Sequence, residues 1–104
     1  MDSRDAWNRY RRDRTEAALA RVMEQARPLV ASVCRRVLLR EQDVDDAVQR
    51  TFVRLLDSSN DGIENVDAWL TVTARNVCLD LARRESRERR RMARHEGFGA
   101  AARR

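Results

Sequence analysis

The apolar residues of this chain recur at intervals of three and four, the spacing that places side chains on one face of an α-helix. Thr15 is a suitable N-cap for a first helix, whose inner face comprises Leu19, Val22 and Met23. Pro28 either opens a second helix or kinks a longer one, because proline is tolerated in the first turn of a helix but not in its interior. The inner face of this second segment comprises Leu29, Val30, Val33, Cys34, Val37 and Leu38.

Two further helices are predicted on either side of a polar turn. Asp43 is expected to cap the third helix, with Asp45 and Asp46 in its first turn, where carboxylates complement the helix dipole. Residues 57–62 have the composition of a turn, and Asp67 is expected to cap the fourth helix. The predicted inner faces are Val44, Ala47, Val48, Phe52 and Leu55 in the third helix, and Trp69, Leu70, Thr73, Val77 and Leu81 in the fourth.

The fourth helix is expected to continue through residues 83–91, although its apolar stripe ends before them. A helix without an apolar face is solvated or bound by a partner. We therefore expect residues 83–91 to lie outside the core, in solvent or against a partner.

The composition narrows the fold class to all-α. The chain has 104 residues, enough for one domain, and only three glycines and one proline, too few for the turns of an all-β fold. We predict a compact bundle of about four helices. No stretch resembles a membrane span or a secretory signal, so we expect no membrane insertion and a cytoplasmic location.

The charge is unevenly distributed along the chain. All 22 basic residues are arginines, and the formal net charge is +5. Residues 1–40 carry a net charge of +5, residues 41–67 carry −6, and residues 68–104 carry +6. An acidic middle between two basic flanks indicates two kinds of partner surface, one of which suits nucleic acid.

Residues that commonly carry catalysis or bind metal ions are few and scattered. Cys34, Cys78 and the single histidine, His95, do not have the spacing of zinc ligands, and no nucleophile lies close in sequence to a histidine base. Each cysteine lies among apolar neighbours, where a reduced thiol behaves as a small buried side chain. We expect no enzyme activity, no metal and no cofactor.

Three segments are candidate binding surfaces, and each has a purely structural alternative. The third helix has polar outer faces, which form either a solvated surface or a docking face for a partner helix. The polar loop at residues 58–66 either connects two helices or forms a pocket for an unpaired base. The fourth helix carries Asn76 and several arginines at helical spacing, which suit base edges and phosphates. Alternatively these residues are surface charge, with Asp80 paired to Arg83 or Arg84.

The aromatic residues also have two interpretations. Trp69 could stack on a base, but it begins an apolar stripe, which favours burial. Trp7 and Tyr10 lie among arginines and could form a basic and aromatic patch, although a loosely packed N-terminal extension is the favoured account.

Two segments resemble region two of bacterial RNA polymerase sigma factors of the sigma-70 family, in particular the extracytoplasmic-function class. Residues 43–55 read DVDDAVQRTFVRL and are similar to the acidic helix of these proteins. Residues 68–84 read AWLTVTARNVCLDLARR and are similar to their next helix, which begins with Trp-Leu and ends with Arg-Arg. The two motifs occur in the expected order around a short polar loop, and the resemblance extends from about Ala17 to Arg91.

The resemblance implies a helical domain that binds core RNA polymerase and the minus-ten element of promoter DNA. In this class the acidic helix docks on the β′ clamp helices, and the corresponding residues here are Asp43, Asp46, Gln49, Arg50 and Val53. The loop that follows captures a base of the non-template strand, which implies roles for Ser58, Ser59, Asn60, Asp61 and Asn65. The next helix contacts DNA and supports strand opening, which implies roles for Arg75, Asn76, Asp80, Arg83, Arg84 and Arg87. At the end of the second helix, expected phosphate contacts are Arg36 and Arg40.

The chain departs from the family pattern at several positions. Asp45 stands where glutamate is usual, and Arg50 stands where glutamate is common, which weakens the acidic face locally. Val72 and Thr73 replace a more apolar pair. The sequence contains no helix-turn-helix region four, and we expect an excised domain whose glycine- and alanine-rich end at residues 97–102 begins a linker.

We expect three parts: an N-terminal extension at residues 1–14, the helical domain at residues 15–92, and a tail or the start of an interdomain linker at residues 93–104. An anti-sigma protein is an expected further partner. Two alternative functions stay open at this point, namely a module held mainly by such a regulator and a generic arginine-rich binder of nucleic acids.

Overall fold

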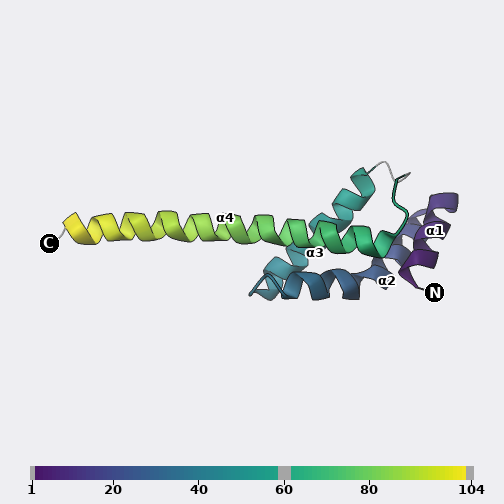
Figure 1. Cartoon of the computed structure of the whole chain (residues 1–104), viewed down its shortest axis with the longest axis horizontal. Helices are drawn as coiled ribbons and strands as arrows, with labels where there is room; N and C mark the ends of the chain where they lie inside the picture. Colours follow the sequence, from purple (N-terminus) through teal and green to yellow (C-terminus); the bar gives the residue numbers. More distant parts are fainter. Residues whose placement is uncertain (1, 59–61, 103–104) are drawn as a thin grey trace.

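Four helices build the computed structural model, which describes residues 2–58 and 62–102 and the side chains of this part up to Arg94. They are α1 (Ser3–Asp13), α2 (Glu16–Arg35), α3 (Glu41–Asp57) and α4 (Val66–Ala102). The first three pack around the beginning of α4, and the remainder of α4 projects from the bundle (Figure 1). The molecule is therefore elongated, with extents of 67 × 23 × 21 Å. The all-α prediction is confirmed.

The boundary between α1 and α2 is specified by local hydrogen bonds. The Asp2 side chain caps α1 by accepting from the backbone N–H of Asp5, and the Thr15 hydroxyl accepts from the N–H of Ala18 at 3.1 Å. Between the helices Arg14 has a left-handed backbone with φ 54°, and its N–H donates to the Tyr10 carbonyl at 2.8 Å. The chain therefore turns sharply here, and Thr15 begins α2 as predicted.

Pro28 lies inside one continuous helix, α2. A separate helix that starts at Pro28 is therefore wrong, and the longer-helix alternative is correct. Proline removes a single backbone hydrogen bond, and the buried residues on both sides hold the two halves of α2 in line. The described part of the chain still has the predicted number of four helices, because α1 is an additional helix that the apolar pattern did not indicate.

Two predicted caps are displaced. α3 begins at Glu41 after Arg40, which makes no side-chain cap bond, so Asp43 lies within the first turn instead of capping it. α4 begins at Val66, and the Asn65 side chain caps it by accepting from the N–H of Ala68 at 3.2 Å. Asp67 instead accepts a hydrogen bond from the Ser3 hydroxyl, which joins the start of α4 to α1.

The core lies where α1, α2, α3 and the first part of α4 meet. The predicted inner face of α3 is buried throughout, and the Thr51 hydroxyl beside it donates to the Ala47 carbonyl at 2.7 Å. In α4, Leu70 and Val77 are buried as expected, whereas Trp69, Thr73 and Leu81 are half-buried. Met23 of α2 is exposed, contrary to its predicted place on the inner face.

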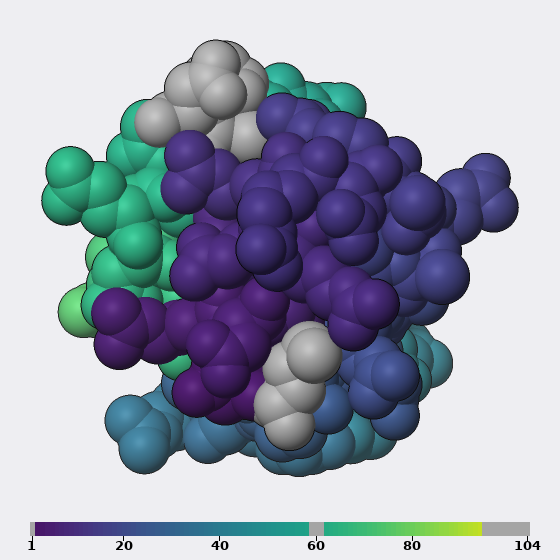
Figure 2. Space-filling model, turned by 90° about the vertical axis from the view of Figure 1, so that its right-hand side faces the viewer, coloured from purple at the N-terminus to yellow at the C-terminus, as the bar shows by residue number. Residues whose placement is uncertain are grey.

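The N-terminal segment is not loosely packed. Trp7 is 2% exposed and belongs to the core together with Ala6, and its ring lies 5.7 Å from that of Tyr10. Figure 2 shows α1 in dark purple across the middle of this end of the molecule. The expectation of a loose extension is therefore wrong for Trp7, because its side chain is large enough to anchor a short helix on the bundle. The domain division at residues 14 and 92 stays a prediction.

None of the helices in the described part of the chain is long and apolar enough to cross a membrane. The backbone of α4 is helical to Ala102, so most of the expected tail continues the helix.

The two cysteines meet in the core, where α2 and α4 pack together. Both thiols are free and fully buried, and they share a hydrogen bond. Burial raises the pKa of Cys34, and burial together with the hydrogen bond that Cys78 donates to Cys34 raises the pKa of Cys78 to about 12. Since the thiolate is the reactive form, we expect these two thiols to be unreactive core residues, as their apolar neighbours in the sequence suggested.

The raised thiol pKa values predict a loss of stability in alkali. Above the ordinary thiol pKa of 9.0, the unfolded chain releases a proton that folded Cys78 retains up to a pH of about 12. The unfolded state then binds fewer protons, so the free energy of unfolding falls as pH rises through this window. We expect the urea midpoint to decline between pH 8 and pH 10.5, and to decline less in the Cys34→Ala, Cys78→Ala double variant. Equal declines in both proteins would contradict the prediction.

Candidate functional site

The side of α3 that faces away from the core carries all five residues of the predicted docking face. We call this surface the α3 outer face: Asp43, Asp46, Gln49, Arg50 and Val53. Gln49 and Arg50 are exposed, both aspartates are half-buried, and the side chain of Val53 is 53% exposed. The helix thus has a buried apolar side and an accessible polar side, as its sequence period predicted.

Ion pairs divide the acids of α3 into two groups. Glu41 pairs with Arg35 at 2.7 Å and Asp45 pairs with Arg27 at 3.3 Å, so these acids join α3 to α2. The hydrogen bond from Arg35 lowers the pKa of Glu41. On the α3 outer face, Asp46 pairs with Arg50 at 2.9 Å. Arg50 therefore offsets one of the two aspartates of this surface and leaves it a net charge of −1, the local weakening of the acidic face that Arg50 was expected to cause.

One residue of this surface was not identified from the sequence. Leu56 is 46% exposed, and it lies one turn beyond Val53 and two turns beyond Gln49 on the same helix. Two neighbouring half-exposed aliphatic side chains form a small apolar patch. The spacing of three residues between Val53 and Leu56 was available in the sequence as a signal.

The ends of the polar loop serve the adjoining helices. The Ser58 hydroxyl donates to the Leu55 carbonyl at 2.7 Å, and Asn65 caps α4. Ile63 and Val66 are buried and anchor the returning chain in the core. Ser59, Asn60 and Asp61 lie outside the described residues.

The side of α4 that faces away from the core carries the predicted DNA residues. By helical spacing Asn76, Asp80, Arg83 and Arg87 share one face, which we call the α4 outer face, while Arg75 and Arg84 are exposed on its flanks. Asp80 pairs with Arg83 at 3.9 Å, as one interpretation predicted, and also with Arg54 of α3 at 3.7 Å. The second contact links the two helices at their surface.

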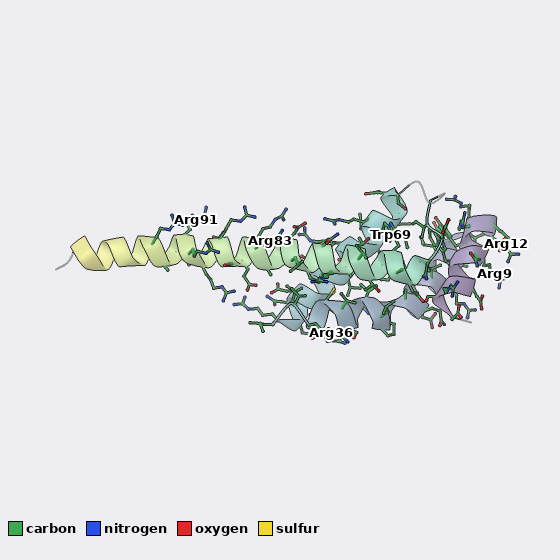
Figure 3. All side chains as sticks on the ribbon, in the orientation of Figure 1. Arg9, Arg12, Arg36, Trp69, Arg83 and Arg91 are labelled. Atoms are coloured by element: carbon green, nitrogen blue, oxygen red, sulfur yellow. The ribbon has the colours of Figure 1, made fainter. Side chains whose placement is uncertain are left out.

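The other two arginines that were expected to contact phosphate, Arg36 and Arg40, lie in the connection between α2 and α3. Arg36 follows the last residue of α2 and is exposed, and Arg40 precedes α3. Arg40 approaches Glu85 of α4 at 4.0 Å, so this connection lies beside α4 where the helix leaves the bundle. Figure 3 shows Arg36 beside the end of α2 and Arg83 on α4.

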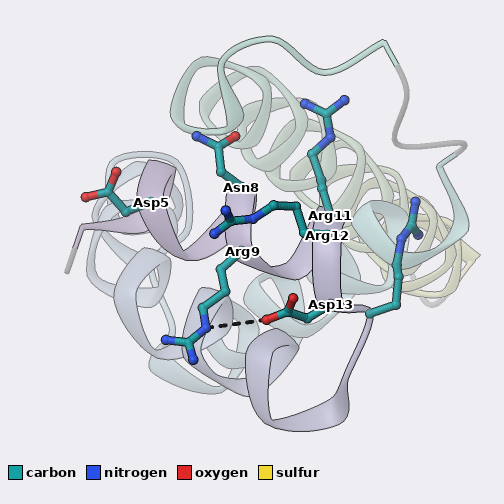
Figure 4. Close-up of a pocket in the computed structure, with 7 residues that line it drawn as sticks. Asp5, Asn8, Arg9, Arg11, Arg12 and Asp13 are labelled. Carbon is teal, nitrogen blue, oxygen red and sulfur yellow. Dashed lines mark ion pairs between the residues drawn. The ribbon is translucent and has the colours of Figure 1, made fainter.

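Trp7, Tyr10 and Trp69 all pack in or against the core. Trp69 packs half-buried against the core, which confirms burial as its main role (Figure 3). A basic and aromatic patch around Trp7 is wrong because that ring is buried, and Tyr10 is partly covered with the Arg14 guanidinium 5.6 Å above it. α1 does present a shallow surface hollow with several arginines, in which Arg9 pairs with Asp13 at 3.5 Å (Figure 4).

The described residues contain no group of three histidine, cysteine or acidic side chains that could hold a metal ion. The candidate site consists of two adjoining surfaces on α3 and α4, one with acids and aliphatic side chains and the other with arginines.

Comparison with known proteins identifies the family. The family model for Sigma-70 region 2 matches residues 22–88, which include most of α2, all of α3 and the first two thirds of α4. Searches of curated proteins and of solved structures gave no match. The matched segment contains both surfaces and the loop between them. The chain therefore belongs to the sigma-70 family, whose members are transcription initiation factors that act with RNA polymerase, and it contains their region 2.

Proposed function

We propose that the chain docks on the β′ clamp helices of core RNA polymerase through the α3 outer face, and binds and helps to melt the minus-ten promoter element. The observation that supports this most is the match of residues 22–88 to Sigma-70 region 2, with both candidate surfaces inside it. Both motifs resemble those of the extracytoplasmic-function class, and we propose that the chain belongs to this class and has a cytoplasmic location.

The DNA side of the proposal uses the loop and α4. Ser58 and Asn65 hold the two ends of the loop, and the loop itself is proposed to receive a base of the non-template strand. Asn76 on the α4 outer face is suited to base edges, and the neighbouring arginines are suited to phosphates. Asp80 acts through the arginines it pairs with, Arg54 and Arg83.

Strand opening by such a surface needs no catalytic residue. A protein that binds the separated strand more tightly than the duplex raises the population of the melted state by that difference in affinity. Phosphate contacts by Arg36, Arg40 and the arginines of α4 would fix the position of the DNA, while the loop distinguishes the base.

An anti-sigma protein is a second proposed partner. Val53 and Leu56 are half-exposed aliphatic residues beside Asp46 and Arg50, a composition that a protein surface covers more readily than DNA does. A regulator that covers this patch would compete with polymerase, because both would use the α3 outer face.

The deciding experiment is binding of the chain to purified bacterial core RNA polymerase. We expect Asp46→Arg to lower the affinity at least tenfold, because it places a positive charge beside Arg50 and removes their ion pair. The matched control is Glu24→Arg, which changes the net charge by the same amount at an exposed position of α2. The exposed Asp46–Arg50 pair contributes only about 0.3–0.5 kcal/mol to folding, so both variants should remain folded.

Three outcomes are informative. Loss of binding in Asp46→Arg alone supports docking through the α3 outer face. Equal losses in both variants indicate a general charge effect and contradict the proposed surface. A folded parent chain that fails to bind core polymerase contradicts the proposed function and favours the regulator-held module.

A further inference from the structure

The charged residues along the exposed side of α3 follow an order that reverses about the middle of the helix. From the residue before α3 to its last residue, the charges are positive, negative, negative, positive, positive and negative. We call these six residues the α3 charge series: Arg40, Asp43, Asp46, Arg50, Arg54 and Asp57. The four outermost or basic members are exposed, and the other two, both aspartates, are half-buried. The series as a whole is neutral.

The members of the series lie on one side of α3. Successive members are three or four residues apart, the spacing that keeps side chains on one side of a helix. The opposite side holds the buried residues, among them Val44, Val48 and Phe52. From residue 40 to residue 57 the series extends over about 26 Å at 1.5 Å per residue.

Each charge of the series has an opposite charge at the mirrored position of the helix. The three mirrored pairs are Arg40 with Asp57, Asp43 with Arg54, and Asp46 with Arg50. The first two pairs are centred midway between residues 48 and 49, and the third is centred on residue 48, about 0.75 Å away along the helix. Two copies of α3 that lie antiparallel about this centre therefore place every charge opposite its complement. The two-fold symmetry of such a pair makes six contacts between the chains out of the three mirrored pairs.

The charges also distinguish between orientations. In a parallel pair each residue faces its own copy, so every contact of the series joins like charges. Like charges placed opposite each other disfavour an interface. The series therefore favours the antiparallel pair alone.

The side chains of the series are available to a second copy. Asp46 and Arg50 form the one close ion pair of the series within the described part of the chain, at 2.9 Å. Arg40 and Arg54 approach carboxylates of α4 at 4.0 Å and 3.7 Å. These contacts are all at the surface, where ion pairs contribute little to stability. A second copy therefore adds partners to the series without breaking any buried contact.

The antiparallel orientation also suits the rest of the surface. Leu39, which is 94% exposed just before α3, comes to the end of α3 that carries half-exposed Leu56 of the other copy. Within one chain, α3 and α4 run in opposite senses along the long axis of the molecule (Figure 1). Antiparallel α3 helices therefore direct the two α4 helices apart, which separates the segments 83–94, each with a net charge of +5.

We propose that the chain forms an antiparallel homodimer through α3, in which the charge series of one copy pairs with that of the other. One helix face about 26 Å long buries less than the roughly 1,200 Å² of a standard interface, so the dimer is weak, with a dissociation constant on the order of 10–100 µM. The dimer covers the α3 outer face, so a chain within it is unable to dock on polymerase. This competition, though not the dimer itself, rests on the proposed function.

The test uses two variants that each reverse one charge, and a mixture of the two. Sedimentation velocity of the whole chain from about 5 to 500 µM measures the equilibrium between monomer and dimer. Asp46→Arg and Arg50→Asp each place like charges opposite one another twice in the dimer, so each should dimerise at least about tenfold more weakly than the parent. An equal mixture of both should form a heterodimer about as tightly as the parent dimerises, because every charge again faces its complement. Glu24→Arg, at an exposed position of α2, changes the net charge as Asp46→Arg does and should dimerise like the parent.

The other results overturn the inference. A parent chain that stays monomeric over this range disproves the dimer, and single variants that dimerise like the parent exclude the α3 charge series. A mixture that fails to associate contradicts the antiparallel register.

A double variant separates the dimer from the proposed function. Asp46→Arg combined with Arg50→Asp should dimerise like the parent, yet bind core polymerase as weakly as Asp46→Arg alone, because the polymerase surface has not changed sign. A parent chain that dimerises but does not bind polymerase disproves only the proposed function.

Discussion

Replacing Val53 and Leu56 together with aspartate is expected to lower the affinity of the chain for core RNA polymerase by about 100-fold or more. The two side chains are 53% and 46% exposed in the free chain, so they are available to a partner and cost little to replace in the fold. A few fully desolvated residues near the centre of an interface carry most of its binding energy, and a carboxylate placed there would be buried without a partner. A 100-fold loss corresponds to about 2.7 kcal/mol.

The matched control is Leu39→Asp with Met92→Asp. These residues are 94% and 56% exposed, lie outside α3, and give the same change in net charge. The control should bind core polymerase like the parent chain in a titration by fluorescence or by calorimetry. Docking through the α3 outer face is disproved if both double variants bind equally well.

Trp7→Ala is expected to lower the free energy of unfolding by about 3–5 kcal/mol, a large part of the total for a domain of this size. The ring is 2% exposed and packs with Ala6 in the core, so its removal leaves a cavity between α1 and the bundle. Urea unfolding followed by circular dichroism measures the change. If residues 1–14 were only an extension, the variant would unfold like the parent chain.

Trp7→Phe is the informative comparison. The indole Nε1 is buried, and none of the described residues accepts a hydrogen bond from it. Phenylalanine keeps most of the ring volume and removes this unpaired donor, whose burial costs roughly 1–3 kcal/mol. We therefore expect a loss below about 1.5 kcal/mol for Trp7→Phe, well short of the effect of alanine.

The core of α3 could be predicted from the sequence because one helix face carries nearly all of its aliphatic residues. The same pattern located the outward-facing residues of the proposed docking face, including half-buried Asp46 and exposed Gln49. Resemblance of residues 43–55 and 68–84 to a known family then assigned roles to both helices, and the match to Sigma-70 region 2 confirmed the family. The periodicity of the apolar residues and the family motifs therefore identify the same two helices, α3 and α4.

Other features depend on contacts that periodicity does not encode. α1 has few apolar residues, and it is attached to the bundle mainly by Ala6 and the large ring of Trp7, with Tyr10 packed against the same core. The start of α4 was displaced because Asn65, and not Asp67, provides the cap, and Asp67 bonds to distant Ser3. The link from Arg54 to Asp80 joins residues of two helices whose relative rotation is set only by packing.

Because α4 is one uninterrupted helix, a small rotation of the bundle produces a large displacement of the far end of α4. From Ala74, which is buried in the bundle, to Arg94 the helix advances about 30 Å. A tilt of the docked bundle by about 7° therefore displaces Arg94 by about 3.5 Å, close to the rise of one base pair. The angle at which α3 docks on polymerase would thus set where the end of α4 lies relative to bound DNA, and a small change at the protein contact would shift that position by about one base pair.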